Sequence, residues 1–399
     1  MNKAIAFFLL FVSIGFLPIP VQAEAGAESD PISGFILDGS LSGTFGSAAS
    51  LLDYREGDDP NRGLAWGLIN LKYRTPELYG FSLGTWLVGV QEIWQEHRGD
   101  YDGVFAHELD LRNLNLSFKV PSTSLDLTLG RVRFLRNPSM DGDSHEGIGA
   151  SCLLLDGLEA YAALVHRWIN NDNTDLNAKG ITGWVDVEDV NDRAADVFLS
   201  LMLSWSPWEE VSVSPYFDYQ ENVMAVVGCE LLGAVPLDGE WSLGFDGIYA
   251  YHGNLVPDSI APGYENVDEL LLHGCLAWRS FSLGAGWYWI SDDRGDIMAG
   301  LFDTFDPLEK DDYYPYDDLN DASEVYLDFQ ADFDPVRLEL YWAWGKNRAY
   351  DVRTQEFNLW AYWDIVESLE LAGFLVWTDY DAGDIPDYNQ FGSSLVFKF

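Results

Sequence analysis

The chain has 399 residues, of which 48% are hydrophobic and 15% aromatic, and its formal net charge is −43. A charge of this size excludes a protein that binds nucleic acid or an anionic surface through its overall electrostatic field. Beyond the N-terminus the sequence contains no run of 18 uncharged apolar residues, so transmembrane helices are not expected.

The N-terminus has the three parts of a secretory signal peptide. The positive start MNK is followed by the apolar stretch AIAFFLLFVSIGFL and then by PIPVQA, which ends in small residues. A retained anchor helix is the alternative, but Pro18 and Pro20 interrupt the segment and no stop-transfer pattern follows. We therefore expect a signal peptide over residues 1–23, cleaved after Ala23, and one domain over residues 24–399.

The three cysteines, Cys152, Cys229 and Cys275, lie far apart in the sequence. An odd number cannot pair completely, and neither a CxxC spacing nor a Cys/His cluster indicates zinc. We expect buried, unpaired thiols rather than a disulfide framework. The sequence predicts no bound metal and no cofactor.

An alternation with a period of two residues dominates the mature chain. In LNLSFKV, Leu114, Leu116 and Phe118 share one face, while Asn115 and Ser117 share the other. A strand of this kind has apolar surroundings on one face and polar surroundings on the other. No helical stretch is expected after the signal peptide. The pattern predicts eighteen strands, near residues 35–45, 64–73, 79–93, 104–120, 125–134, 147–156, 158–168, 193–206, 210–220, 222–236, 241–252, 268–279, 281–291, 324–332, 336–346, 354–364, 368–379 and 391–399.

The connections between these strands mostly alternate between long polar loops such as WQEHRGDYDG and short turns such as PSTS. The link after the strand at 210–220 is an exception, because it is short where a long loop is due. A sheet in a bilayer has to close on itself so that no edge is left unpaired. The sequence therefore predicts an all-β transmembrane antiparallel barrel of about 18 strands, with 16 as the alternative count. A soluble sandwich or β-helix would share the alternation but not this rhythm.

Aromatic residues support the membrane setting. Rings that are apolar but carry a polar group favour the membrane interface, and seven tryptophans fall near predicted strand ends: Trp66, Trp168, Trp205, Trp208, Trp241, Trp278 and Trp377. The chain also ends on SSLVFKF, in which Leu395, Phe397 and Phe399 alternate with other residues. We expect the last strand to close the barrel against the first. Phe399 would then be the mark that the outer-membrane assembly machinery recognises.

Residues 109–168 resemble the core of the OprD-type substrate-specific porins. In that family a strand ending in Gly-Arg-x-Arg leads into an Asn-Pro loop, followed by Asp and by Glu-Gly. Those elements stand here at residues 130–133, at 137–138, at Asp141 or Asp143, and at 146–147. The layout is also similar to that of the related alginate-export barrels, and the resemblance implies a monomeric barrel of 18 strands. Ser144 and His145 depart from the family pattern, which more often has an apolar or aromatic residue there.

The loop near residues 135–146 is the third long loop in this arrangement. A loop that folds inward narrows the pore of a large barrel, and selectivity is set by the groups that line the narrowest section. We predict that this loop folds into the lumen and that basic wall residues face acidic loop residues across the pore. The candidate constriction residues are Arg131, Arg133, Arg136, Asp141, Asp143, His145 and Glu146.

The face on which these arginines lie depends on Gly130. Regular alternation after the preceding leucines would turn Arg131 and Arg133 toward lipid, where a mid-depth arginine costs roughly 2–4 kcal/mol. We predict a bulge at Gly130 that swaps the faces, so that both arginines face the lumen while Val132 and Phe134 face out. The alternative is that all three arginines lie above the membrane.

The acidic stretch over residues 292–321 offers many carboxylates. They could hold Ca²⁺ or Mg²⁺, or favour cations at the pore mouth. The spacing of an EF-hand is missing, so a solvated external loop is the simpler interpretation.

Some barrels are enzymes, and His145 directly follows Ser144. Neighbouring residues on a strand point to opposite faces, however, and Ser144 does not lie in a GxSxG motif. We predict no catalytic residue and no enzymatic activity.

Together these features predict an outer-membrane porin, a passive channel for small hydrophilic solutes or ions in a Gram-negative envelope. The alternative is an export barrel for an acidic polysaccharide, which would need a broadly basic lumen, whereas the chain has 22 basic against 65 acidic residues. A structural barrel with a plugged lumen is a third class. The expected partners are outer-membrane lipid, the solutes and the assembly machinery, and not nucleic acid.

Overall fold

The computed structural model describes residues 35–36, 38–54, 62–95, 108–134, 136, 138, 145–169, 184–186, 197–255, 266–291, 321–348, 351–381 and 387–399. The predicted signal peptide lies outside these residues. Among the described residues, no helix is both long and apolar enough to cross a bilayer.

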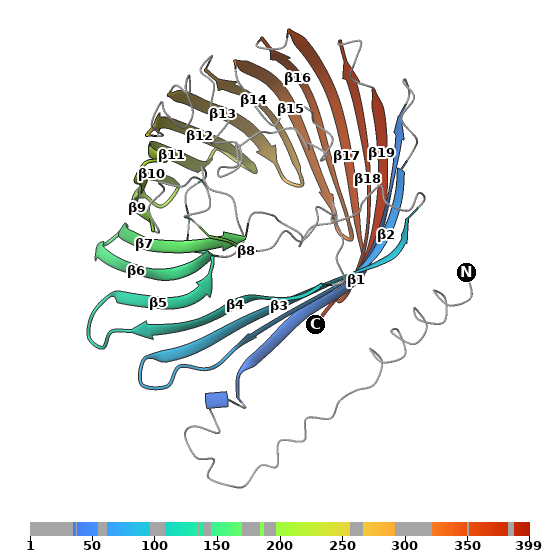
Figure 1. Ribbon diagram of the computed structural model, residues 1–399. Coiled ribbons are helices and arrows are strands. Elements are labelled where there is room, and N and C mark those ends of the chain that lie inside the picture. Colours follow the sequence, from blue (N-terminus) through green and yellow to red (C-terminus); the bar gives the residue numbers. More distant parts are fainter. Residues whose placement is uncertain are drawn as a thin grey trace.

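A single antiparallel sheet contains all the strands (Figure 1). Eighteen of them form the wall of a closed barrel, and the short β8 pairs with β7 only. The strands are β1 (Ser40–Tyr54), β2 (Arg62–Arg74), β3 (Phe81–Gln95), β4 (Glu108–Lys119), β5 (Leu125–Val132), β6 (His145–Leu155), β7 (Leu158–Ile169), β8 (Trp184–Asp186), β9 (Phe198–Trp208), β10 (Val211–Gln220), β11 (Met224–Pro236), β12 (Trp241–Asn254), β13 (Val267–Trp278), β14 (Phe281–Ile290), β15 (Ala322–Phe333), β16 (Val336–Asn347), β17 (Val352–Val366), β18 (Leu369–Tyr380) and β19 (Tyr388–Lys398).

The barrel closes between its first and last strands, as predicted. β1 and β19 pair antiparallel from Thr44 opposite Lys398 to Tyr54 opposite Tyr388. The backbone of Phe399 exchanges two hydrogen bonds with that of Gly43, 3.0 and 3.1 Å long. Closure satisfies the backbone groups that an open sheet would leave unpaired in hydrocarbon.

The predicted first strand is displaced in the structure. The sequence placed it at 35–45 and assigned residues 46–54 to a loop, whereas β1 spans Ser40–Tyr54. The reason is that GSAAS consists of small residues whose alternation carries little hydrophobic contrast. The short link after the strand at 210–220 is real, because residues 221–223 join β10 to β11 directly. β8 was not predicted.

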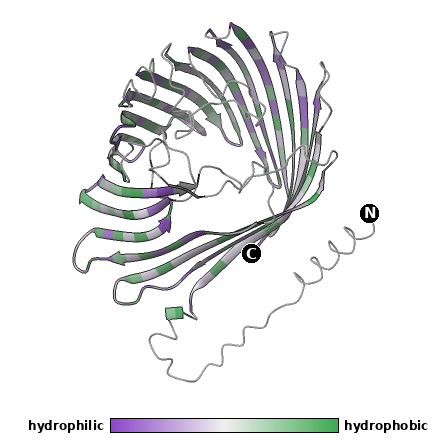
Figure 2. Ribbon diagram, viewed as in Figure 1, coloured by the Kyte–Doolittle hydropathy of each residue, from purple (hydrophilic) through white to green (hydrophobic). Residues whose placement is uncertain are grey.

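The two faces of the wall differ in chemistry, which produces the striped colouring along the strands (Figure 2). Leu129 and Leu283 on the outer face are 57% and 61% exposed, while the inward Glu269 and Glu356 are each 1% exposed. The period-two alternation therefore separates an apolar exterior from a polar interior, which is the arrangement that suits a strand between lipid and a lumen. The three cysteines are free thiols and are half-buried rather than fully buried as expected.

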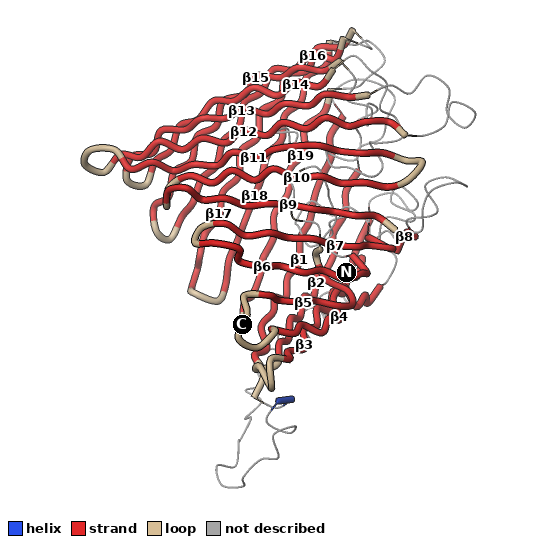
Figure 3. Tube along the Cα trace, turned by 90° about the vertical axis from the view of Figure 1, so that its left-hand side faces the viewer, coloured by secondary structure: helices blue, strands red, loops and turns tan. Residues whose placement is uncertain are grey.

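Short turns gather at one end of the barrel, here called the short-turn end (Figure 3). The opposite end carries most of the longer connections and is called the long-loop end. Near the short-turn end Trp241 stacks on Trp278 with ring centroids 5.8 Å apart, and Trp278 stacks on Phe281 at 6.1 Å. Trp205 and Trp208 are also exposed there. Trp66 differs from the prediction, because it is only 3% exposed and packs among inward residues. The side chain of Trp168 is outside the described residues.

Candidate functional site

The lumen is bounded by two arcs of wall with opposite charge. One arc, over β2–β7, carries lysine and arginine side chains, and the other, over β11–β17, carries buried carboxylates. The order of the strands around the ring places these arcs on opposite sides of the barrel (Figure 1). The site is therefore the space between them rather than a single cluster.

The basic arc contains a cavity of about 370 Å³ whose lining includes Lys72, Arg74 and Arg136. Two of these cations lie over aromatic rings: Lys72 Nζ is 4.4 Å from the centroid of Trp86, and the Arg136 guanidinium is 4.2 Å from that of Tyr161. Such cation–π contacts hold a charged side chain against the wall while leaving its charge toward solvent.

The chain after β5 turns inward along this arc. Phe134 is 1% exposed and packs on Gly149, where a Cβ atom would lie 2.8 Å from the phenyl ring. The backbone N–H of Phe134 donates to Nδ1 of His145 at 3.3 Å. Two residues further on, Arg136 forms an ion pair with Glu159 at 3.3 Å. Phe134 and Arg136 therefore lie against the inner wall, while the inward fold of the whole loop near 135–146 stays a prediction.

The predicted bulge at Gly130 is wrong. The pairing of β5 with β4 and with β6 runs through Gly130 without a shift of register, so the alternation of faces continues. Arg131 consequently lies opposite Leu114 and Glu146 on the outer face, and Val132 and Phe134 pack with inward residues. Gly130 has a φ of 114°, a conformation that glycine adopts without the penalty of a side chain.

The predicted constriction residues are thus divided between the two faces. Arg133 and Arg136 line the cavity, and His145 is fully buried on the inner side. Arg131 and Glu146 form an ion pair on the outer face. Asp141 and Asp143 lie outside the described residues.

Sequence reasoning missed Arg112, which is 0% exposed. Alternation from Leu114 would assign Arg112 to the lipid face. The pairing of β3 with β4 shifts between Trp86 and Leu87, however, so Arg112 is an extra residue at a bulge. An outward arginine of a barrel wall could not be fully covered, so we place this side chain on the inner side. Only the short-range polar pattern around it, ELDLRN, could have drawn attention to it.

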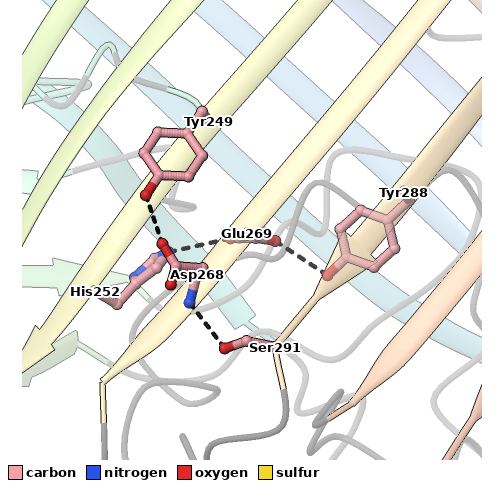
Figure 4. A network of polar contacts seen from close by, with 6 residues as sticks. All are labelled: Tyr249, His252, Asp268, Glu269, Tyr288 and Ser291. Carbon is pink, nitrogen blue, oxygen red and sulfur yellow. Dashed lines mark hydrogen bonds and ion pairs between the residues drawn. The ribbon is translucent and has the colours of Figure 1, made fainter.

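The acidic arc is built from side chains that hold one another across neighbouring strands (Figure 4). Glu269 on β13 accepts the hydroxyl hydrogen of Tyr288 on β14 at 3.1 Å and pairs with Nε2 of His252 on β12 at 3.1 Å. Asp268, the neighbour of Glu269, points to the other face and accepts a hydrogen bond from the Tyr249 hydroxyl. Successive carboxylates thus serve opposite faces of the wall.

A second pair lies nearer the short-turn end of the same arc. His273 on β13 and Asp328 on β15 are joined at 2.7 Å, although β14 runs between them. The pair can form because Gly284 of β14 has no side chain in its path. The ring of His273 also stacks on Tyr326, with centroids 5.6 Å apart.

Opposite charges on the two arcs can select solutes by their charge. Charged groups fixed on opposite sides of a water-accessible passage create a transverse field, which orients dipolar or charged solutes by attraction and repulsion. Among the described residues, no group of three or more His, Cys, Asp or Glu side chains is placed to hold a metal ion.

No known protein-family model matches this sequence, and no curated protein matches it. Solved structures do match. OccK9 (OpdG) of Pseudomonas aeruginosa aligns with a TM-score of 0.71 and 16% identity over 92% of this chain and 100% of its own. OccAB1 of Acinetobacter baumannii aligns with 0.70 and 14%, over 92% and 97%. OccD3 (OpdP) of Pseudomonas aeruginosa aligns with 0.65 and 12%, over 90% and 91%.

The fold is that of a transmembrane β-barrel of 18 strands, which confirms the predicted fold class. More particularly, the chain shares the fold of the OprD-type outer-membrane porins, as its central 60 residues suggested.

Proposed function

We propose that this protein is an outer-membrane channel through which small hydrophilic solutes or ions diffuse passively. The observation that carries the proposal is the closed wall with an apolar exterior and a polar interior, in which a basic arc faces an acidic arc. The fold shared with the OprD-type porins supports it. Under this proposal the long-loop end faces the cell exterior.

We propose further that the segment after β5 narrows the channel. Phe134 and Arg136 lie inside the wall, and Arg133 borders the same cavity. Arg112, Arg133 and Arg136 form the basic side of the proposed constriction, together with His145. Asp141 and Asp143 would supply acidic groups from the rest of the loop.

The proposal is tested by inserting the purified protein into planar lipid bilayers. Discrete conductance steps are expected, and the reversal potential in a salt gradient reports whether cations or anions pass preferentially. A protein that inserts, migrates as a folded barrel and yet gives no steps would instead be a plugged or structural barrel.

Two other functions fit less well. Export of an acidic polysaccharide needs a broadly basic passage, whereas one side of the inner wall carries the carboxylates Glu269, Asp328 and Glu356. Hydrolysis by Ser144 and His145 is disfavoured because Nδ1 of His145 already accepts the backbone N–H of Phe134. We therefore propose transport without catalysis.

Assembly is proposed to depend on the C-terminal residue. The Phe399 ring is 44% exposed, stacks on Phe45 at 5.2 Å and lies at the seam of the barrel. An exposed aromatic ring at the seam is accessible to an assembly factor before closure and remains in the lipid interface afterwards.

A further inference from the structure

Two arginines and a histidine converge on one carboxylate on the outer face of the barrel. Oε2 of Glu146 on β6 is 3.3 Å from Nε of Arg131 on β5 and 3.6 Å from Nη1 of Arg167 on β7. Its other oxygen, Oε1, is 3.9 Å from Nε2 of His166. We call these four residues the outer cationic cluster. Its members belong to three adjacent strands, so the wall itself fixes their spacing.

Within the outer cationic cluster the two arginines outnumber the one carboxylate, and Asp186 lies opposite Arg167 in the ladder between β7 and β8. Two guanidinium groups share the carboxylate of Glu146, and the imidazole of His166 adjoins it. The side chains are 27–50% exposed, so the cluster is accessible from the outside of the wall. Its sign is opposite to that of the whole chain, whose net charge is −43. The overall field repels anions, so an anion at this place would have to be held by the local arginine side chains.

Apolar side chains lie directly below the cluster on the same strands. Leu129, Ile148 and Leu164 are each two residues farther from the long-loop end, on the same outer face, and are 57%, 45% and 46% exposed. A band of exposed aliphatic groups under a patch of fixed cations matches a molecule with an anionic headgroup and acyl chains. Arginine pairs bind phosphate strongly because several N–H groups can donate to one oxyanion.

We infer that the outer cationic cluster binds the phosphorylated headgroup of a lipid in the outer leaflet, with the acyl chains against the leucine and isoleucine side chains below. The inference uses only the membrane orientation from the proposed function and does not depend on conduction. Glu146 holds the two guanidinium groups apart and in place, so that the phosphate meets a preorganised pair rather than two mobile side chains.

The test measures lipid retention by the purified full-length barrel in native mass spectrometry, with bis-phosphorylated lipid A as the probe. We compare the wild type with Arg131→Gln, Arg167→Gln and the double variant. The matched control is Arg353→Gln, an exposed arginine on the outer face of β17 at the same end of the barrel. Heat-modifiable migration in gels establishes that each variant is folded, and the single variants keep the test informative if the double variant does not fold.

The double variant is expected to bind lipid A about tenfold more weakly or worse, each single variant less so, and Arg353→Gln as tightly as the wild type. Dephosphorylated lipid A should bind all of them equally weakly. Equal binding of lipid A by wild type and double variant would overturn the inference, as would an equal loss in Arg353→Gln. Displacement of lipid A by inorganic phosphate at similar concentration would show an ion site only. Because the readout is binding, a barrel that fails to conduct would contradict the proposed function and leave this result standing.

Discussion

At the scale of residues, the acidic arc depends on the absence of a side chain at Gly284. A Cβ atom there would lie 2.2 Å from Oδ2 of Asp328 and 2.5 Å from Nε2 of His273. No real atom tolerates such contacts, so any other residue must push the two partners apart. A side-chain pair that spans a whole strand is thus made possible by a single hydrogen atom in place of a side chain.

We expect Gly284→Val to destabilise the barrel by about 1–3 kcal/mol, because the valine overpacks the site and separates a buried polar pair. Chemical denaturation in detergent, followed by tryptophan fluorescence, measures the change. Gly274→Ala is the control, since the nearest atom to a Cβ there is 3.9 Å away. Equal stability of Gly284→Val and the wild type would mean that the pair contributes nothing to the wall.

Among the cations of the basic arc, Arg136 is the one whose removal should have the clearest effect on the ion selectivity of the channel. Its ion pair with Glu159 is roughly half exposed, and exposed pairs of this kind contribute only about 0–1 kcal/mol to stability. Arg136→Gln should therefore fold normally but move the reversal potential in a salt gradient toward that of the cation. Arg279→Gln, which removes an exposed arginine paired with Glu240 near the short-turn end, is the control and should shift it less. A shift of opposite sign would remove Arg136 from the passage.

The residue scale is also where sequence reasoning was least successful. We predicted a bulge in β5 that would turn Arg131 inward. The structure instead has a bulge in the neighbouring strand β4, where Arg112 is the extra residue and is buried. Alternation assigns a face only while the register is regular. A single sequence does not mark where an extra residue enters a strand, because the position of a bulge depends on the register with the neighbouring strand.

At the scale of elements, the return of the chain after β5 is anchored by one aromatic contact. Phe134 fits against Gly149 because the strand β6 has no side chain at that position, and Tyr161 completes the pocket. Val132, Phe134 and Arg136 lie along the inner wall as a consequence. The inward fold of the loop near 135–146 was predicted from the plan of the barrel and stays a prediction, whereas the contact of Phe134 with Gly149 was not predicted.

We expect Gly149→Val to displace Phe134, since a Cβ atom at this position would lie 2.8 Å from its ring. The segment would then lose its anchor, and single-channel conductance should rise. Ala162→Val on β7 is the control, because its side chain lies opposite the outward Leu201. Unchanged conductance in Gly149→Val would show that the described segment does not narrow the channel.

Apart from β1, the wall strands were predictable, because their period-two pattern is strong enough to survive errors of a few residues at their ends. β1 was misplaced because its small residues gave little contrast between faces. The opposed charged arcs were not predictable, since they require the order of strands around a ring as well as the face of each residue.

At the scale of the whole molecule, the seam between β1 and β19 joins the two ends of the barrel domain. The backbone of Phe399 pairs with Gly43, while its ring lies outside against Phe45. The backbone hydrogen bonds of Phe399 close the barrel whatever its side chain is. The phenyl ring of Phe399 can therefore serve a different purpose.

If the assembly machinery recognises this ring, Phe399→Ala should refold in vitro with nearly the yield of the wild type. Its level in the outer membrane of cells should fall severalfold. Phe391→Ala, which removes a similarly exposed ring from the same strand, should affect neither measurement. A parallel loss in vitro and in cells would show that the ring acts in closing the barrel rather than in recognition.

A ring of paired strands has no free end at which an added residue could be accommodated. One residue inserted into a strand must be absorbed by a bulge, or else it turns the later side chains of that strand to the wrong face. Evolution is thereby left free to exchange side chains but not to change strand lengths. This explains how a barrel with 16% identity to OccK9 can still be superposed along the full length of that protein.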